Sequence, residues 1–304
     1  MEITFLGTGS GVPSKKRNVT SIALSMLQER DEVWLFDCGE ATQHQILNTT
    51  IKPRKIAKIF ITHMHGDHIF GLPGFLSSRS FQDGTLPIEI YGPKQIKKFI
   101  ETSLETSQTH LQYPIKYSEV KEGIIYEDEQ LFVKAIPLKH GIPSFGFIIE
   151  QYDSIGPLLP EKLKEKGIQP GPIYKLIKEN EKVELEDGTI IYRKDVTGPP
   201  IKGKKIAIFG DTQYDESVIE HIKDADVLIH EGTFRHKDLE LARNYFHSTA
   251  LQSAEIAKKA NVKHLILTHV SSRYHQDDLN EELKFVKNTF EHIEYAYDFY
   301  TYTI

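Results

Sequence analysis

A short run of metal-ligand side chains lies near residue 65 of the chain. Four of them fall within six residues: His63, His65, Asp67 and His68. Imidazole and carboxylate groups are ligands that suit zinc. Alternate spacing points the first two histidines one way and the last two residues another, and Gly66 gives the loop the backbone freedom that it needs. The run therefore predicts a loop that supplies ligands to two metal ions.

Two metals need more ligands than this loop provides. The best additional candidates follow apolar runs elsewhere in the chain, at His140, Asp211 and His269. A carboxylate has two oxygens and can hold paired metals about 3.5–4 Å apart. Asp211 is therefore the expected bridge between them.

Four apolar runs end directly on a metal-capable residue. They are residues 59–63, 206–211, 227–230 and 265–269. Strand ends are stiff platforms from which several side chains can converge on one point. Two of these runs share a Thr-His ending at opposite ends of the chain, as expected of a fold built from two similar halves.

The rest of the sequence alternates β-branched runs with helical patterns. Strands are expected at residues 2–6, 20–25, 32–36, 58–62, 88–91, 131–136, 145–150, 205–209, 227–230 and 263–268, and from 295 onward. Helices are expected at residues 41–48, 93–105, 215–222, 249–259 and 279–288. Meandering strands followed by strands that alternate with helices predict an α/β fold in which helices cover sheets.

Residues 152–194 interrupt this pattern. Proline and glycine recur there, above all in Gln169-Pro170-Gly171-Pro172, and they stop regular structure. Residues 158–182 hold six lysines and four glutamates, so this piece carries +2 while the rest of the chain carries −8. The segment predicts a protrusion with little apolar surface to bury, and a surface insertion without function is the alternative.

Composition sets the remaining limits. The chain has 304 residues, of which 39% are hydrophobic and 26% charged, as in ordinary globular proteins. No apolar run approaches the ~18 residues that span a membrane, and the first residues do not resemble a signal peptide. The single cysteine, Cys38, fits a reducing cytoplasm and is expected to be a small buried side chain. The net charge of −6 leaves room only for a local basic surface.

The ordered motifs at residues 63–68, His140, Asp211 and His269 resemble those of the metallo-β-lactamase superfamily over nearly the whole chain. More narrowly, the sequence resembles the short-form tRNase Z family. Four stretches carry that match: residues 5–18, which end in Pro-x-Lys-x-Arg-Asn, and residues 169–172, 230–234 and 246–250. The resemblance implies one αββα four-layer sandwich over residues 1–304, with residues 152–194 as an inserted, protruding flexible arm that grips tRNA.

The resemblance also implies an activity. The expected enzyme is a zinc-dependent endoribonuclease, a metal-dependent phosphodiesterase, that removes the 3′ trailer from precursor tRNA and leaves a 3′-hydroxyl on the tRNA and a 5′-phosphate on the trailer. It would hold two Zn²⁺ per subunit, form a homodimer in the cytoplasm, and bind neither DNA nor membrane. Asp67 would be both a ligand and the general base that orients the attacking water. His247 would be the metal-free general acid, although a helix-entry cap is an alternative role for it.

Other residues are expected around this site. Glu231 would orient His247 or a ligand histidine. Arg273 would stabilise phosphoryl charge, and Lys15 and Arg17 would contact phosphates. A solvated arginine and a basic turn are the respective alternatives. Ser248 departs from the resemblance, since many members carry an acidic residue there.

The zinc ligands alone do not separate a nuclease from other enzymes. The same metal core serves lactonases, thioester hydrolases, β-lactamases, small-molecule phosphodiesterases and arylsulfatases. A catalytically silent zinc scaffold is a further alternative. The inserted segment and the loop at residues 13–18 favour the nuclease, because a small-ester hydrolase needs neither.

Overall fold

The computed structural model describes residues 1–185 and 187–304. They divide into two compact units. The main unit comprises residues 1–127, 132–149 and 205–304, and the inserted unit comprises residues 128–131 and 150–204. Each unit is described by itself below.

The first sheet of the main unit has seven strands. Their order is β18 (Thr301–Thr303), β1 (Glu2–Gly7), β3 (Ser21–Met26), β4 (Glu32–Phe36), β5 (Ile56–Phe60), β6 (Ile88–Gly92) and β7 (Ile115–Glu119). Strand β1 is antiparallel to both neighbours, and β4 to β7 run parallel. The parallel strands β4 and β5 therefore end at the same edge of the sheet.

The second sheet also has seven strands. Their order is β17 (Ile293–Tyr295), β15 (Leu265–Thr268), β14 (Val227–Glu231), β13 (Lys205–Phe209), β10 (Ser144–Gln151), β9 (Leu131–Leu138) and β8 (Gly123–Glu127). Strands β13, β14 and β15 are parallel, so their carboxyl ends also meet at one edge. A short parallel pair, β2 (Gly9–Ser10) with β16 (Val270–Ser271), joins the N-terminal region to the segment after β15.

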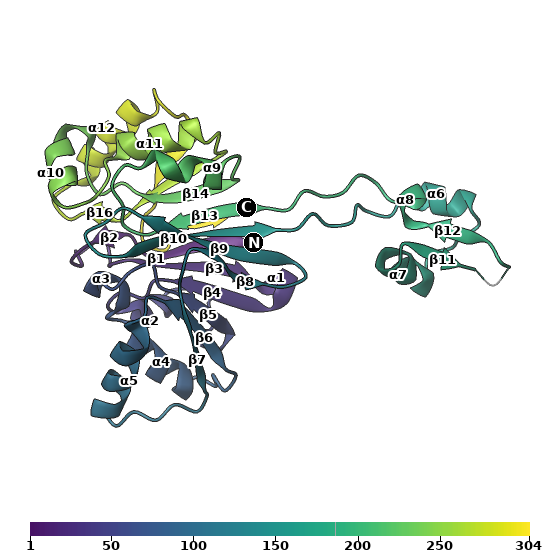
Figure 1. Ribbon diagram of the computed structural model, residues 1–304, viewed down its shortest axis with the longest axis horizontal. Coiled ribbons are helices and arrows are strands. Elements are labelled where there is room, and N and C mark those ends of the chain that lie inside the picture. The colour runs from purple at the N-terminus through teal and green to yellow at the C-terminus, as the bar shows by residue number, and fades with distance from the viewer. Residues whose placement is uncertain (186) are drawn as a thin grey trace. The chain divides into compact units, whose positions relative to one another are not determined.

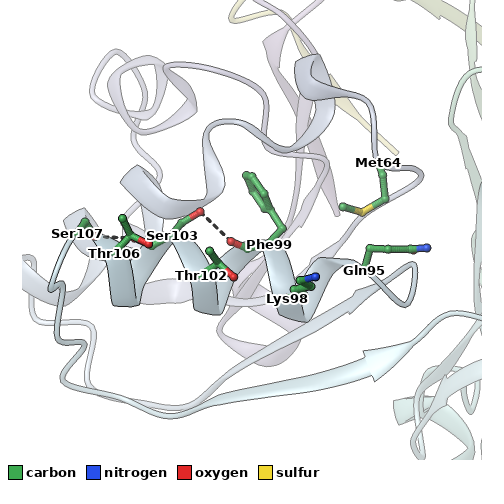
Figure 2. Close-up of a pocket in the computed structure, with 8 residues that line it drawn as sticks. All are labelled: Met64, Gln95, Lys98, Phe99, Thr102, Ser103, Thr106 and Ser107. Atoms are coloured by element: carbon green, nitrogen blue, oxygen red, sulfur yellow. Dashed lines mark hydrogen bonds between the residues drawn. The ribbon is translucent and has the colours of Figure 1, made fainter.

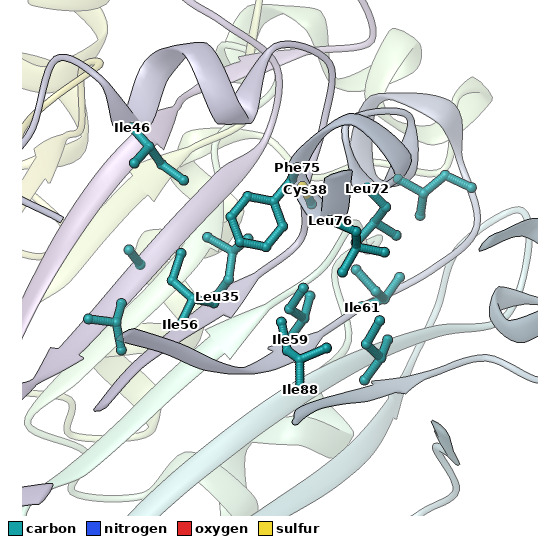
Figure 3. Close-up of a cluster of buried hydrophobic side chains, with 14 of the residues drawn as sticks. Leu35, Cys38, Ile46, Ile56, Ile59, Ile61, Leu72, Phe75, Leu76 and Ile88 are labelled. Carbon is teal, nitrogen blue, oxygen red and sulfur yellow. The ribbon is translucent and has the colours of Figure 1, made fainter. Parts of the chain in front are cut away.

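The two sheets pack face to face through aromatic side chains. The ring of Phe147 lies 6.0 Å from that of Phe36 and 5.4 Å from that of Phe60. Because side chains alternate along a strand, the neighbouring Leu35 and Ile59 face the other way. They pack with buried side chains of the helices on that side (Figure 3).

Helices cover both outer faces (Figure 1). The first sheet packs on α2 (Thr42–Ile46), α4 (Leu72–Phe81) and α5 (Ile96–Thr106). The second packs on α9 (Ile219–Ile222), α11 (Ala250–Lys259) and α12 (Gln276–Val286). The shorter helices of the main unit are α1 (Leu27–Arg30), α3 (Gly66–Ile69) and α10 (Leu239–Asn244). The αββα arrangement confirms the predicted fold class.

Most predicted elements lie within a few residues of their observed bounds. The strands β7 and β8 were missed, and so was the helix α4. Its sequence starts Leu72-Pro73-Gly74, which suggests a break, whereas proline fits the first turn of a helix. Gly71 before it lies so close to Gly39 that a Cβ would come within 1.9 Å of the Gly39 carbonyl oxygen. Among the described residues, no helix is long and apolar enough to cross a membrane.

The inserted unit contains α6 (Pro160–Glu165), α7 (Pro172–Glu179), β11 (Lys182–Glu184), β12 (Ile190–Tyr192) and α8 (Arg193–Val196). Strands β11 and β12 form an antiparallel pair. Its buried side chains are Leu163, Ile168, Ile177, Ile191 and Val196. The interpretation that this segment has little apolar surface to bury was therefore wrong. A small core holds the unit together and leaves its lysines on α6 and α7 exposed.

Candidate metal centre and active site

The predicted ligands converge in two groups. The first ligand group is His63, His65, His140 and Asp211, and the second is Asp67, His68 and His269. Within each group the ligand atoms lie within 4.8 Å of one another. His63 and Asp67 lie beyond β5 of the first sheet, whereas Asp211 and His269 lie just beyond β13 and β15 of the second. The site is thus assembled from strand ends of both sheets.

Asp211 belongs to the first group but also lies close to histidines of the second. Its Oδ2 is 3.6 Å from Nε2 of His63 in the first group and 3.4 Å from Nε2 of His269 in the second. Its Oδ1 is 3.4 Å from Nε2 of His68. Burial alone would raise the pKa of Asp211, but the surrounding imidazoles of His269, His68 and His63 hold it well below its usual range. A charged carboxylate therefore reaches histidines of both groups, as a bridge requires.

Four ligand histidines are held through Nδ1, which leaves Nε2 facing the centre. The partners are Thr62 Oγ1 for His63 at 2.9 Å, Asp37 Oδ2 for His68 at 2.7 Å, the Phe246 carbonyl for His140 at 2.8 Å and Thr233 Oγ1 for His269 at 2.9 Å. Such bonds fix ring orientation and tautomer in metal sites. His65 is reversed, because its Nδ1 lies 3.0 Å from Nε2 of His63 and 3.1 Å from Nε2 of His140.

The chemistry of these donors fits a metal such as zinc. Nε2 of His68 is buried, and among the described residues it has no hydrogen-bond partner. Burial and then the neighbouring His68 lower the pKa of His63 well below its ordinary value, and burial followed by His140 lowers that of His65. Burial opposes a charge on His68, but the carboxylates of Asp211 and Asp37 outweigh it and raise its pKa well above its ordinary value, so a metal cation there would take the place of a proton. Imidazole and carboxylate donors of this kind are ligands for Zn²⁺.

Asp37 is a functional candidate that sequence reasoning missed. Besides His68, its buried carboxylate accepts hydrogen bonds from the Thr62 amide and the Thr62 hydroxyl, each at 2.8 Å. Thr62 in turn contacts His63, so one carboxylate orients a ligand in each group. The backbone of Asp37 is in the left-handed region, with φ of 55°. The available signal was an apolar strand, β4, that ends on an acidic residue like the runs singled out above.

We expect Asp37→Asn to weaken metal binding by roughly 10- to 100-fold, because outer ligands of metal sites contribute on that scale. The measurement is a competition titration against a zinc chelator. The matched control is Asp298→Asn, since Asp298 is a part-buried carboxylate that bonds the Thr8 hydroxyl and the Asn18 amide rather than a ligand histidine. Equal metal affinity in the two variants would refute the orienting role.

Asp67 is held by the glycine-rich opening of the chain, because the Gly11 amide donates to its Oδ2 at 2.8 Å. The same oxygen lies 3.3 Å from Nε2 of His269 and 3.5 Å from Nε2 of His68. Burial would raise the pKa of Asp67, but these two imidazoles outweigh it and hold the pKa far below its usual range. So acidic a carboxylate is better suited to orient a water than to keep its proton.

His247 pairs with a buried glutamate beside the ligand groups. Its Nδ1 lies 3.0 Å from Oε1 of Glu231, and its ring centroid lies 5.1 Å from that of His140 and 5.3 Å from that of His269. Burial opposes a charge on His247, but the Glu231 carboxylate outweighs it and raises its pKa to about 9. A protonated imidazole at this position is suited to general-acid catalysis.

Backbone amides hold Glu231 in place. The Thr212 amide donates to Oε1 at 2.7 Å and the Ser248 amide to Oε2 at 2.9 Å. The alternative role of His247 as a helix cap is wrong, because Thr249 caps α11 and forms a capping box with Gln252. Ser248 donates its amide to Glu231 and its hydroxyl to the Thr212 carbonyl, so it supports the pair although it is not acidic.

The three cations proposed to contact phosphate have different surroundings. Arg17 donates through Nη1 to the Thr8 hydroxyl and the Ala296 carbonyl, both at 2.7 Å, so part of its guanidinium supports the fold. Arg273 lies 5.2 Å over the ring of Phe234. Lys15 is exposed and lines a cavity of about 840 Å³ with residues after β16. Phosphate contact by these side chains stays a prediction.

A second, more apolar groove of about 630 Å³ runs along α5 (Figure 2). It is lined by Met64, Gln95, Lys98, Phe99, Thr102, Ser103, Thr106 and Ser107. Met64 belongs to the loop of candidate ligands at residues 63–68, but its neighbours His63 and His65 do not line the groove. The metal centre and this groove are therefore separate features of the surface.

Comparison with known proteins agrees with this geometry. A family model described as anti-Pycsar protein Apyc1 matches residues 1–155, and a beta-lactamase superfamily domain matches residues 183–270. The chain is 55% identical to ribonuclease Z of Bacillus cereus strain B4264 over 305 aligned residues, which cover 100% of this chain and 99% of that protein. Ribonuclease Z of Bacillus thuringiensis strain Al Hakam is likewise 55% identical with the same coverage.

Solved structures give the same result. The short form of human tRNase Z is 31% identical, with a TM-score of 0.72 and coverage of 100% of this chain and 99% of that one. The metallo-beta-lactamase fold protein YhfI of Bacillus subtilis, at 18% identity and a TM-score of 0.68 over 99% and 98% of the two chains, shares the fold. The strand-end ligands, the buried Glu231–His247 pair and the full-length similarity together place this chain in the ribonuclease Z family.

Proposed function

We propose that this chain is a tRNA 3′-processing endoribonuclease that holds two zinc ions, one in each ligand group, and removes the 3′ trailer from precursor tRNA. The observation that carries the proposal is the pairing of His247 with Glu231 beside the two ligand groups, where Asp211 of the first group lies 3.4 Å from His68 and His269 of the second. Bound zinc supplies charge that polarises a phosphoryl oxygen and lets hydroxide form near neutral pH.

Two residues of the chain handle the proton transfers of the reaction. Asp67, fixed by the Gly11 amide, accepts a hydrogen bond from the attacking water and orients it toward phosphorus. The proton that the water loses as it attacks passes through this carboxylate to bulk solvent. The new bond forms between the water oxygen and phosphorus, and the bond between phosphorus and O3′ of the tRNA breaks. His247 gives its proton to the departing O3′. The products are a tRNA with a free 3′-hydroxyl and a trailer with a 5′-phosphate.

We propose that lysine and arginine side chains bind the phosphates of the tRNA. The exposed lysines on α6 and α7 of the inserted unit are proposed to contact the phosphates of a folded RNA. Lys15, Arg17 and Arg273 are proposed to contact phosphates nearer the cleaved bond. We further propose a cytoplasmic homodimer in which the inserted unit of one subunit serves the site of the other and DNA is not a substrate. Light-scattering mass in solution tests the dimer.

The direct test of this function is cleavage of an intron-free precursor tRNA by the purified, zinc-loaded protein. The expected products are one tRNA that ends in a 3′-hydroxyl at the trailer boundary and one trailer that begins with a 5′-phosphate. Sequencing of both ends locates the cut. A protein that hydrolyses a small phosphodiester but leaves the precursor intact would instead be a small-molecule phosphodiesterase.

Removing the inserted unit should separate the two activities. The bridges between Ser154 and Ile201 and between Leu158 and Thr197 mark its base, so replacing residues 159–196 with a short Gly-Ser linker removes the small core whole. We expect kcat/KM for precursor tRNA to fall on the order of 10²-fold, because several phosphate contacts are lost. Hydrolysis of a chromogenic phosphodiester should stay the same.

A matched variant keeps the inserted unit folded. Lys162, Lys164, Lys175 and Lys178 are exposed, and their joint replacement by glutamine leaves the buried cluster intact. This variant should bind precursor tRNA more weakly and with a shallower dependence on salt. An unchanged salt dependence, or an equal loss of both activities in the deletion variant, would contradict the assignment.

A further inference from the structure

We propose that Phe246 is a positioning residue that stacks on the base of the nucleotide whose O3′ leaves. The inference rests on the proposed function and deepens it, since it assigns a protein contact to one nucleotide at the cleaved bond. Three observations carry it: how the backbone of Phe246 is anchored, how its ring is exposed, and which residue follows it.

The backbone of Phe246 is tied to the metal centre. Its carbonyl accepts the hydrogen bond from Nδ1 of His140 at 2.8 Å. Its φ of 60° lies in the left-handed region, where a bulky residue pays a conformational cost. The amide of Phe246 donates a hydrogen bond to the Arg243 carbonyl at 3.3 Å. The amide of the next residue, His247, donates one to the Ala242 carbonyl at 2.8 Å. The residue is therefore held at a fixed place relative to a metal ligand and the acid.

The ring of Phe246 is open to solvent although its backbone is fixed. The residue is 47% exposed. A Cβ built on Gly141 would lie 3.4 Å from Cδ2 of Phe246, so part of the ring rests on the backbone just after His140. The adjacent Tyr245 is 59% exposed and stacks on the buried Phe234, with centroids 6.3 Å apart. Exposed aromatic rings on a rigid support are platforms on which nucleic-acid bases stack.

The position of the acid selects the nucleotide. His247 protonates the departing O3′, so the nucleotide that carries this oxygen must lie against His247. Phe246 directly precedes His247 and shares its anchoring loop. The base within reach of the ring is therefore that of the last tRNA nucleotide before the cut, on the 5′ side of the cleaved bond. Stacking recognises the flat face that every base has, so this contact positions the tRNA end without selecting one base.

The test is a coupling experiment with two proteins and two substrates. Wild type and Phe246→Ala are assayed on precursor tRNA with a normal base, and with an abasic site, at the last nucleotide before the cut. We expect Phe246→Ala to lower kcat/KM by roughly 10- to 100-fold on the normal substrate, the scale of one stacked base. On the abasic substrate it should cause no further loss, because the two changes remove the same contact.

Controls separate stacking from loss of structure. Phe246→Tyr keeps an aromatic ring and should restore most of the activity, with zinc content unchanged. Phe81→Ala removes another exposed phenylalanine, at the end of α4, and should behave like wild type. An abasic site at the first trailer nucleotide should leave the effect of Phe246→Ala in place.

The outcomes that overturn the proposal are distinct from those that overturn the function. An equal loss on normal and abasic substrates refutes stacking on this base. A loss that disappears only when the trailer nucleotide is abasic refutes the assignment to the leaving side. Failure of the wild-type protein to cleave precursor tRNA refutes the function itself.

Discussion

Asp211→Asn should lower kcat/KM toward precursor tRNA by on the order of 10⁴-fold, because the variant loses the charged bridge between the two ligand groups. The Asp211 carboxylate is buried and lies within 3.6 Å of histidines from both groups. An amide of the same shape keeps the fold but removes the negative charge that offsets two cations. Metal analysis of the purified variant should show fewer than two zinc ions per chain.

The matched control for this substitution is Asp215→Asn. Asp215 is also a largely buried carboxylate after β13, but it bonds the Lys139 ammonium at 3.0 Å and caps a turn rather than facing the metal centre. It should keep full metal content and activity. Chelation of the wild-type protein should abolish cleavage and added zinc should restore it. Full activity of Asp211→Asn with two zinc ions bound would show that the carboxylate is not the bridge.

His247→Asn should slow cleavage of precursor tRNA by about 10²- to 10⁴-fold, the usual contribution of a general acid. The reason is that O3′ of a ribose leaves poorly without a proton. A p-nitrophenyl phosphodiester has a leaving group that is stable as an anion, so its hydrolysis should change far less. Zinc content should be unchanged. An equal loss on both substrates would show that His247 binds metal or supports the fold instead.

Glu231→Gln gives this prediction a pH signature. The Glu231 carboxylate raises the pKa of His247, so the acid form is kept up to higher pH and is lost as pH rises through that pKa. Removing the charge lowers the pKa, and the alkaline fall in kcat should move to lower pH. A pH profile of single-turnover cleavage measures the shift. An alkaline limb that stays in place would show that the pair does not set the protonation of the acid.

The sequence predicted the layers, and the candidate ligands that it singled out lie together, because both depend on local patterns. Apolar runs that end on His63, Asp211 and His269 mark strand ends, and the parallel strands within each sheet bring such ends to one edge. Glu231 was expected to orient either His247 or a ligand histidine, and it lies 3.0 Å from His247. In each case a short stretch of sequence contains both the functional residue and the end of the strand that positions it.

Features that depend on distant contacts were harder to predict. Asp37 orients His68, which lies 31 residues later in the chain. The sequence around Asp37 does not indicate which residue it contacts. The helix α4 starts with Leu72-Pro73-Gly74, and proline and glycine are poor helix signals although the first helical turn tolerates proline. In the inserted unit, Leu163 and Ile191 belong to different elements, and their common burial appears only when the chain folds back on itself.

The convergence of strand ends from both sheets has a consequence for the supply of active protein in a cell. The ligands extend from His63 to His269, so an unfolded chain keeps only those of residues 63–68 together and cannot present the full set. An ion that binds only the native state shifts the folding equilibrium by mass action, and proteases remove chains that unfold. When zinc is scarce, a fraction of these chains should be lost by degradation as well as by inactivity. The abundance of the enzyme would then follow the metal status of the cell.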